Sequence, residues 1–217
     1  MPVVHRYNPF ATRYVASARL TPRDEQGERL DLPLIVQRLA RLGNMAAIVG
    51  PHGTGKSTLL AHLAETLRER GRSVTRTRVR RRVAMADLIR TLVGVPRGGM
   101  LCIDSWEVLG QEGRLVLRGL AWCRGVGLLV TAHHTVGLPT LASTRGTAPL
   151  LMALTRELPG YESWFGRYVF PDDITAAVAD SAGDLRLAFN QLYDRFEYRS
   201  RGQGNWSAPR PVGQLPR

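Results

Sequence analysis

The sequence has almost no lysine, and this scarcity draws attention to one position. Of 30 lysine and arginine side chains, only Lys56 is a lysine. Acidic residues are few as well, 18 in total, so the chain of 217 residues carries a formal net charge of +12. Such an excess is compatible with a nucleic-acid partner, because clustered cations attract phosphate backbones. A strong preference for arginine over lysine is also typical of a GC-rich genome, so the charge alone leaves both explanations open.

Long apolar runs and secretory features are lacking too. No apolar run approaches the roughly 20 residues that a membrane-spanning helix needs. The first ten residues lack the apolar core of a signal peptide, so we expect a cytoplasmic protein without membrane contact. The two cysteines, Cys102 and Cys123, have no partner motif, and we expect buried thiols rather than a disulfide or a metal site.

Apolar residues make up 44% of the chain, enough for one sizeable core. Short continuous apolar runs predict strands covered on both faces, and an alternating run predicts an exposed edge strand. The strands predicted in this way are 45–49, 100–103, 126–130, a short one at 168–170, and the edge strand within 71–83. Helical periodicity separates several of them, for example in a helix that begins at Lys56 and ends before Gly71. Strands that alternate with helices predict a parallel sheet with right-handed crossovers.

The strongest motif follows the first predicted strand directly. Residues 50–57, GPHGTGKS, match the pattern G-x-x-x-x-G-K-[ST], between a strand and a helix as the motif requires. Backbone N–H groups of such a loop surround phosphates, and the next helix directs its positive end at the same anion. The expected nucleotide-binding residues are Gly50, Pro51, His52, Gly53, Thr54, Gly55, Lys56, Ser57 and Thr58.

The motif also explains the single lysine. Lys56 is expected to contact the β- and γ-phosphates, and Ser57 to place its hydroxyl on Mg²⁺. A planar guanidinium on a longer side chain does not fit where a compact ammonium does. Arginine is therefore tolerated elsewhere in the chain and excluded at this position.

Two acidic residues are candidates for the metal and for the attacking water. Asp104 ends an apolar strand, at the sheet edge where open α/β proteins bind ligands, so we expect it to support Mg²⁺. A helix N-cap is the alternative role for this residue. Glu107 is a candidate for orienting or deprotonating water, although a surface glutamate in a first helical turn fits equally well. Glu112 is a weaker candidate for the same role.

Polar residues also follow the strand predicted at 126–130. Thr131 and His133 are positioned to contact the γ-phosphate or the water, with ordinary strand-end hydrogen bonding as the alternative. His133 and His134 point to opposite faces of an extended strand, and no carboxylate or cysteine nearby completes a ligand set. The pair therefore predicts no metal site.

Together these motifs resemble the additional-strand branch of P-loop NTPases, which includes the AAA+ ATPases. Residues 50–58 are similar to Walker A, 100–104 to Walker B and 128–135 to the strand that carries sensor 1. Residues 181–190, SAGDLRLAFN, resemble the sensor 2 segment of AAA+ lids, and this resemblance implies a γ-phosphate contact for Arg186. Ser105 departs from the family, which usually has glutamate after the Walker B aspartate. No arginine is clearly placed to act on a neighbouring subunit, although Arg145, Arg156 and Arg167 are candidates.

We therefore expect an α/β fold, a parallel-sheet P-loop NTPase core of three α/β/α layers with a short helical C-terminal lid. The expected parts are an N-terminal lead-in (1–43), the NTPase core (44–171), a small helical lid (172–198) and a disordered basic tail (199–217). The expected function is Mg²⁺-dependent ATP hydrolysis coupled to a nucleic-acid or protein partner, with a homo-oligomer left open. The residues expected to act in hydrolysis are Lys56, Asp104, Glu107, Thr131, His133 and Arg186. GTP is disfavoured, because no [NT]-K-x-D segment is present.

Two alternatives remain. One is a nucleotide-dependent switch or scaffold with little hydrolysis, which binds nucleic acid through arginines of the predicted edge strand: Arg76, Arg78, Arg80, Arg81 and Arg82. A solvated edge strand protected by charge explains the same arginines. The other alternative is a P-loop kinase acting on a small molecule.

Overall fold

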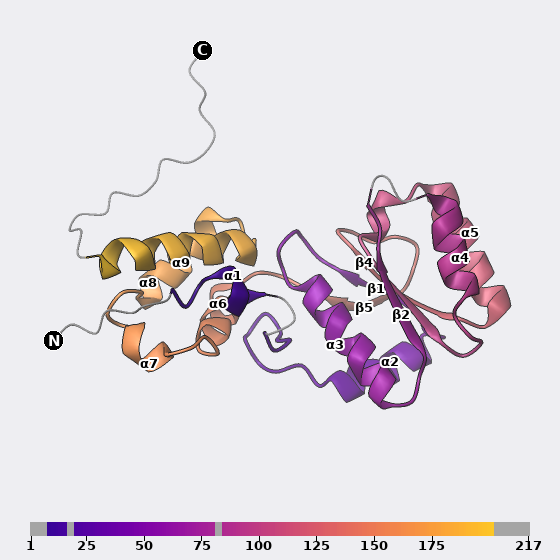
Figure 1. The fold of residues 1–217 in the computed structure, drawn as a ribbon, viewed down its shortest axis with the longest axis horizontal. Coiled ribbons are helices and arrows are strands. Elements are labelled where there is room, and N and C mark those ends of the chain that lie inside the picture. The colour runs from indigo at the N-terminus through magenta and orange to yellow at the C-terminus, as the bar shows by residue number, and fades with distance from the viewer. Residues whose placement is uncertain (1–7, 17–19, 81–83, 202–217) are drawn as a thin grey trace, which may run out of the picture.

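The computed structural model describes residues 8–16, 20–80 and 84–201. Five strands form one parallel sheet: β1 (Met45–Val49), β2 (Val74–Arg78), β3 (Met100–Asp104), β4 (Gly127–Ala132) and β5 (Thr140–Ser143). Their order in the sheet is β2-β3-β4-β1-β5, so β2 and β5 are the two edges. The strand that precedes the phosphate motif therefore lies between β4 and β5, inside the sheet (Figure 1).

Helices cover both faces of this sheet. Those before and between the strands are α1 (Thr12–Val15), α2 (Leu32–Arg41), α3 (Lys56–Glu69), α4 (Met85–Val93), the 3₁₀ turn η1 (Trp106–Val108) and α5 (Gln111–Arg124). Helices α2 and α3 pack with alternate strand residues such as Ile48 and Leu129 on one face. Helices α4 and α5 pack with the intervening residues, such as Leu128 and Val130, on the other face. The three-layer α/β/α core predicted from the sequence is confirmed.

The apolar runs that predicted β1, β3 and β4 are buried because both faces of these strands are covered. Every residue of β4 is buried, and so are the first four residues of β3. Strand β2 alternates between partly buried and exposed residues at its end, as expected at an edge. A continuous apolar sequence belongs to a central parallel strand, and an alternating one to the edge.

Two predictions made from the sequence are wrong: the strand at 168–170 and the burial of Cys123. The strand predicted at 168–170 is absent, and only an isolated bridge joins Phe165 and Val169. The fifth strand is instead β5, whose sequence TLAS has one fully buried residue, Leu141, and so gave no apolar run. Cys123 is exposed on α5, whereas burial raises the pKa of the Cys102 thiol to about 12.

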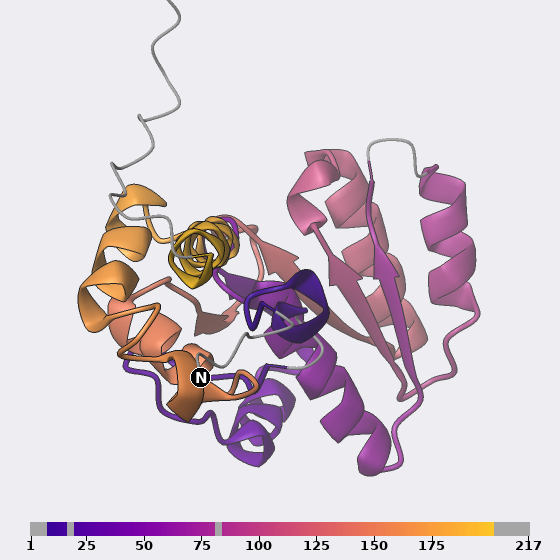
Figure 2. The same cartoon turned by 60° about the vertical axis from the view of Figure 1, so that its left-hand side comes forward.

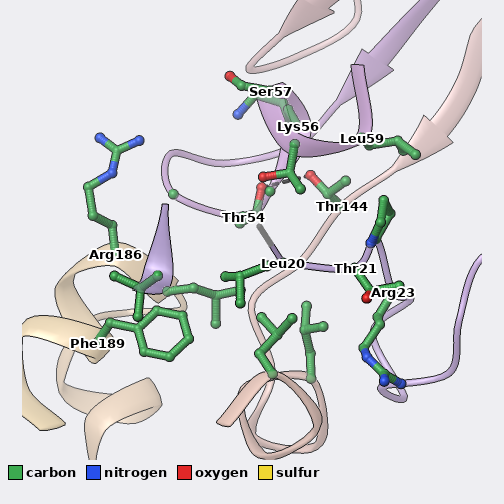
Figure 3. A pocket seen from close by; sticks show the side chains of 18 of the residues that line it. Leu20, Thr21, Arg23, Thr54, Lys56, Ser57, Leu59, Thr144, Arg186 and Phe189 are labelled. Carbon is green, nitrogen blue, oxygen red and sulfur yellow. Dashed lines mark hydrogen bonds between the residues drawn. The ribbon is translucent and has the colours of Figure 1, made fainter. Parts of the chain in front are cut away.

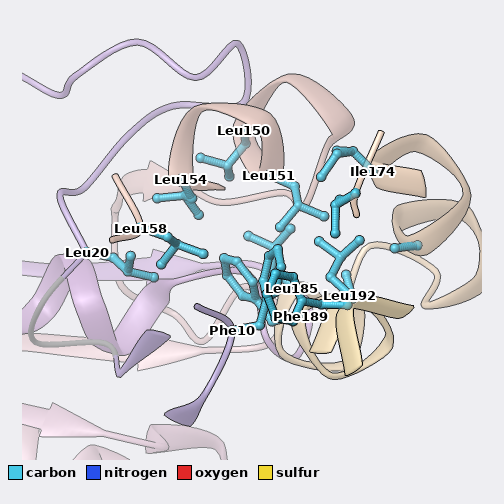
Figure 4. Close-up of a cluster of buried hydrophobic side chains, with 14 of the residues drawn as sticks. Phe10, Leu20, Leu150, Leu151, Leu154, Leu158, Ile174, Leu185, Phe189 and Leu192 are labelled. Atoms are coloured by element: carbon cyan, nitrogen blue, oxygen red, sulfur yellow. The ribbon is translucent and has the colours of Figure 1, made fainter. Parts of the chain in front are cut away.

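A second group of helices lies at one side of the sheet, beyond β5 (Figures 1 and 2). These helices are α6 (Ala148–Thr155), α7 (Tyr161–Trp164), α8 (Pro171–Asp180) and α9 (Leu185–Ser200). They share a core with Phe10 and Leu20 from the N-terminal segment (Figure 4). No helix among the residues described here has both the length and the apolar character needed to cross a membrane.

A buried ion network holds α8 against α9. Asp173 accepts hydrogen bonds from Arg199 Nη2 at 3.0 Å and from Arg195 Nη1 at 3.2 Å, and its backbone carbonyl accepts from Arg195 at 2.8 Å. Burial alone would raise the pKa of Asp173, but the hydrogen bonds from Arg199 and from the Phe170 N–H, together with the charges of Arg199 and Arg195, outweigh it and lower the pKa.

The packing of the helices suggests different boundaries between the parts of the chain from those predicted from the sequence. Helices α6 and α7 share one core with α8 and α9, although the predicted division assigned them to the NTPase core. Residues 199–200, assigned to a disordered tail, continue α9, while 202–217 lie outside the described residues. The lead-in contributes Phe10 to the helical core and Val36 to the sheet core. We therefore propose that the helical part is 148–200.

Candidate nucleotide-binding site

The loop between β1 and α3 is shaped by glycines that no other residue could replace without strain. Gly53 and Gly55 have φ values of 68° and 93°, in the left-handed region that favours glycine. A Cβ on Gly50 would lie 2.3 Å from the backbone oxygen of Thr144. The hydroxyl of Thr54 donates to Pro51 O at 2.9 Å and lies 2.7 Å from the Thr144 hydroxyl. Thr144, the residue that follows β5, therefore packs against the loop and supports it.

The ammonium of Lys56 is held inside this loop. Its Nζ donates to Gly50 O at 2.7 Å and to Pro51 O at 2.5 Å, and lies 3.3 Å from His133 Nδ1. Only 8% of Lys56 is exposed. Burial lowers the pKa of Lys56, while Glu107 and Asp104 oppose the shift. The three contacts match the three protons of an ammonium group, so the position suits lysine.

Ser57, Asp104 and Thr131 form one hydrogen-bonded group next to the lysine. The Ser57 hydroxyl lies 2.9 and 3.0 Å from the two carboxylate oxygens of Asp104, and Thr131 Oγ1 donates to Asp104 Oδ1 at 2.6 Å. Asp104 is thus bound to the phosphate loop and to β4, and no helix begins at this residue. A hydroxyl and a carboxylate are hard oxygen donors, which fit Mg²⁺.

The chain turns sharply after Asp104. Ser105 has φ 66°, a left-handed conformation that is uncommon for a residue other than glycine, and its N–H donates to Thr131 Oγ1 at 3.0 Å. This turn leads into η1, which carries Glu107. Strained backbone of this kind is found at functional sites more often than elsewhere.

Glu107 and His133, which the sequence places 26 positions apart, meet at the ends of β3 and β4. His133 Nε2 lies 2.8 Å from Glu107 Oε1, while Glu107 Oε2 is buried and has no hydrogen-bond partner within the described segments. Burial, then the charge of Lys56, lowers the pKa of His133, so a neutral ring that donates from Nε2 and accepts at Nδ1 accounts for both contacts. The ring of His52 lies over that of His133, with centroids 3.6 Å apart. His52 is itself exposed, and its ring packs against His133 in the neighbouring loop after β4.

Helix α9 reaches the loop from the helical part. Asp184 caps α9 by accepting from Arg186 N at 2.9 Å and Leu187 N at 3.2 Å. A Cβ on Gly53 would lie 1.8 Å from Asp184 Oδ1, so the cap and the loop are in contact. Arg186 extends from α9 beside the loop, with an exposed side chain (Figure 3).

The loop and the helical part enclose a pocket of about 560 Å³. Its polar end is formed by the loop and the start of α3, together with Arg186. Its apolar end is formed by leucines and one aromatic ring from the N-terminal segment, α6 and α9: Leu20, Leu30, Leu150, Leu154, Leu185 and Phe189. Figure 3 shows Leu20 and Phe189 at this end. The volume is within the range of small-ligand sites.

Sequence patterns did not identify the apolar end or the Asp184 contact. Leu20 stands in a segment without periodicity, and Phe189 reads as an ordinary core residue of a helix. Their common position depends on how the helical part packs beside β5. Arg145, Arg156 and Arg167 are all exposed, and none of them lines this pocket.

No family model matches the sequence. Among solved structures, RuvB from Thermotoga maritima, a Holliday junction branch migration motor, superposes with a TM-score of 0.53 and 20% identity, over 74% of this chain and 58% of RuvB. AMPPCP-bound DnaA from Aquifex aeolicus has a TM-score of 0.50 and 12% identity, over 79% and 64% of the two chains. The replication initiator DnaA bound to AMPPCP and single-stranded DNA has a TM-score of 0.51 and 13% identity, over 78% and 63%. The chain thus spans less than two thirds of the length of these proteins.

RuvB and DnaA are AAA+ P-loop ATPases. At these identities the likeness concerns the fold, and it confirms the predicted fold class, an α/β P-loop NTPase core with a parallel sheet.

Proposed function

We propose that this chain binds ATP together with Mg²⁺ and hydrolyses the bond between the β- and γ-phosphates. The observation that carries the proposal is the group formed by Lys56, Ser57 and Asp104 at the polar end of a pocket large enough for a nucleotide. The fold shared with RuvB and DnaA supports the same nucleotide class.

The triphosphate would take the place of the loop carbonyls that Lys56 now contacts. A β- or γ-phosphate oxygen offers the ammonium a charged acceptor, which forms a stronger hydrogen bond than Gly50 O or Pro51 O does. The loop N–H groups and the amino-terminal end of the 14-residue helix α3 add partial positive charge. Binding would therefore release Lys56 from its own loop.

Mg²⁺ would be held by the Ser57 hydroxyl and supported by Asp104. When bound, the ion supplies positive charge that neutralises the phosphate oxygens. Thr131 keeps the Asp104 carboxylate oriented by donating to Oδ1. These residues form one connected group, so loss of any one of them should weaken metal binding.

Glu107 is the group that we propose to accept the proton of the attacking water. His133 holds Glu107 Oε1, which leaves the unpartnered Oε2 as the acceptor. The water oxygen would attack the γ-phosphorus, the bridging bond to the β-phosphate would break, and the proton would pass to Glu107. In this scheme Glu107 takes the role that Ser105 cannot fill, and Arg186 contacts the γ-phosphate from α9.

The base would occupy the apolar end of the pocket. Leu20 from the N-terminal segment and the aromatic ring of Phe189 from α9 both line this end and offer apolar surface to a base. We propose adenine here, on the likeness of the fold to two ATPases and the missing [NT]-K-x-D segment.

We also propose that nucleotide state is passed to a partner. RuvB is a branch migration motor and one DnaA structure holds single-stranded DNA. A nucleic acid or a protein fits the cationic excess of this chain, and assembly into a homo-oligomer fits its exposed arginines at 145 and 156.

Hydrolysis is tested by comparing two glutamine variants. Glu107→Gln should leave ATP affinity unchanged and slow ADP release by about 10²- to 10⁴-fold, the usual contribution of a general base. Glu112→Gln, an exposed residue in the first turn of α5, removes the same charge and should change neither quantity. Equal rates for wild type and Glu107→Gln would contradict the assignment of the base.

A further inference from the structure

The outer edge of the sheet carries exposed arginines that the proposed hydrolysis does not use. Strand β2 is the edge strand farthest from the helical part (Figure 1). Arg76 and Arg78 are both exposed on it. They are two residues apart, so their side chains leave the same face, about 7 Å apart along the strand. Arg76 makes no hydrogen bond or ion pair within the part of the chain described here. Arg80 is also exposed, while Arg81 and Arg82 lie outside the described residues.

This face continues onto α3. Arg76 is paired in register with Cys102, and the charges of Arg68, Arg72 and Arg76 all act on the Cys102 thiol. Among these three arginines, Arg68 forms an ion pair with Glu65, with 3.1 Å between Arg68 Nη1 and Glu65 Oε2. A net positive strip therefore runs from the end of α3 along β2.

The strip ends at the proposed metal site. Arg78 is paired in register with Asp104, and its Nε lies 3.7 Å from Asp104 Oδ2. Ser57 and Thr131 donate to the same carboxylate. One arginine thus belongs both to the exposed edge and to the surroundings of the carboxylate that would support Mg²⁺.

We propose that this edge binds the phosphate backbone of a single polynucleotide strand, and that Arg78 couples this binding to Mg²⁺–nucleotide binding. The second half of the proposal rests on the proposed function. Guanidinium groups match phosphates with paired hydrogen bonds, and one row of them on an extended strand follows one row of phosphates. A duplex presents two rows across a groove, which a single strand edge does not follow.

The coupling follows from charge. The Arg78 cation beside Asp104 opposes the approach of Mg²⁺ to the same carboxylate. A backbone phosphate bound to Arg78 neutralises that cation and draws it away, so Mg²⁺–nucleotide binds more tightly. By linkage, Mg²⁺–nucleotide raises polynucleotide affinity by the same factor. Because 62% of the Arg78 side chain is exposed, we expect a factor of about two to five, as for exposed ion pairs.

Two matched variants separate binding from coupling. Arg76→Gln and Arg78→Gln each remove one cation from the same face of β2, and each should weaken binding of labelled oligodeoxythymidylate and reduce its dependence on salt by about one phosphate contact. The full chain is titrated by fluorescence anisotropy at low salt, with and without Mg²⁺ and a non-hydrolysable ATP analogue. The wild type and Arg76→Gln should bind about two- to fivefold more tightly with the analogue. Arg78→Gln should show no difference, and Arg78→Lys, which keeps the charge, should restore part of it.

The outcomes also separate this inference from the proposed function. Binding of the analogue without any oligonucleotide binding at low salt overturns the inference and leaves the nucleotide site intact. Equal competition by polyglutamate, or tighter binding of a duplex of matched length, overturns the assignment to a single polynucleotide strand. Coupling that persists in Arg78→Gln overturns the role of Arg78. Oligouridylate that competes as well as oligodeoxythymidylate supports recognition of the backbone alone.

Discussion

Replacing Gly53 by alanine tests whether helix α9 rests on the phosphate loop. The new Cβ would lie 1.8 Å from Asp184 Oδ1, so the carboxylate must move. Moving it removes the hydrogen bonds from Arg186 N and Leu187 N, an N-cap loss of about 1 kcal/mol. Alanine at a φ of 68° costs about another 1–2 kcal/mol. Gly53→Ala should therefore lower the free energy of unfolding by about 2–3 kcal/mol.

A double-mutant cycle isolates the contact. Asp184→Ala alone loses only the cap, about 1 kcal/mol. In the double variant no carboxylate remains to be displaced, so Gly53→Ala then costs only its backbone strain. The loss of unfolding free energy in the double variant should therefore be about 1 kcal/mol smaller than the sum of the two single losses. Gly55→Ala is the matched control, because φ is 93° there and no atom outside its immediate chain neighbours lies within 4 Å of the new Cβ. Its loss should add to that of Asp184→Ala.

Urea unfolding followed by tryptophan fluorescence measures these free energies. Trp164, at the end of α7, is fully buried in the helical core against the rings of Phe10 and Phe196 and reports on the helical part. Additive losses for Gly53→Ala and Asp184→Ala would contradict the contact between cap and loop. The nucleotide pocket would then lack one of its walls.

Three further predictions concern the pocket, the helical part and the turn after β3. Phe189→Leu removes the aromatic face from the apolar end of the pocket, so ATP affinity should fall about fivefold while tripolyphosphate affinity stays unchanged. A competition assay measures both affinities, and an equal loss for the two ligands would place the base elsewhere. The pKa of Asp173 in the folded protein lies below its ordinary value of 3.8, so ionised Asp173 stabilises the fold above that pH and this contribution is lost as pH falls toward the folded pKa. The free energy of unfolding, measured as the pH is lowered, should show this loss in the wild type and lack it in Asp173→Asn. Because Ser105 has φ 66°, Ser105→Val should destabilise the fold by about 1–2 kcal/mol, whereas Ser105→Gly should be neutral within about 0.5 kcal/mol. Equal urea midpoints for the two variants would exclude backbone strain at this residue.

Local patterns predicted the elements whose burial is decided close by in the sequence. Strands β1, β3 and β4 are covered on both faces, so each appears as an apolar run, and the phosphate loop carries its glycines and Lys56 in a fixed spacing. Strand β5 escaped prediction because only Leu141 of its four residues is fully buried. In the short run at 168–170, Val169 is buried and Tyr168 partly buried in the helical core, whereas Phe170 is exposed. Only the isolated bridge between Phe165 and Val169 forms there, and no neighbouring strand among the described residues completes a ladder.

The site shows the same division. Asp104, Glu107 and His133 were each singled out from their positions at strand ends. The contact of Glu107 with His133 could not be predicted, because it depends on β3 and β4 being neighbours and on the turn at Ser105. The apolar end of the pocket, with Leu20 and Phe189, depends on long-range packing that no local pattern records.

If the loop that carries the only lysine of the chain binds the triphosphate, ATP binding depends on Lys56. Calorimetric titration with Mg²⁺–ATP compares the wild type with Lys56→Ala, after circular dichroism has shown that the variant is folded. We expect one ATP bound per chain in the wild type and no heat of binding in the variant. Equal affinity of the two proteins for Mg²⁺–ATP would show that the triphosphate does not bind at this loop.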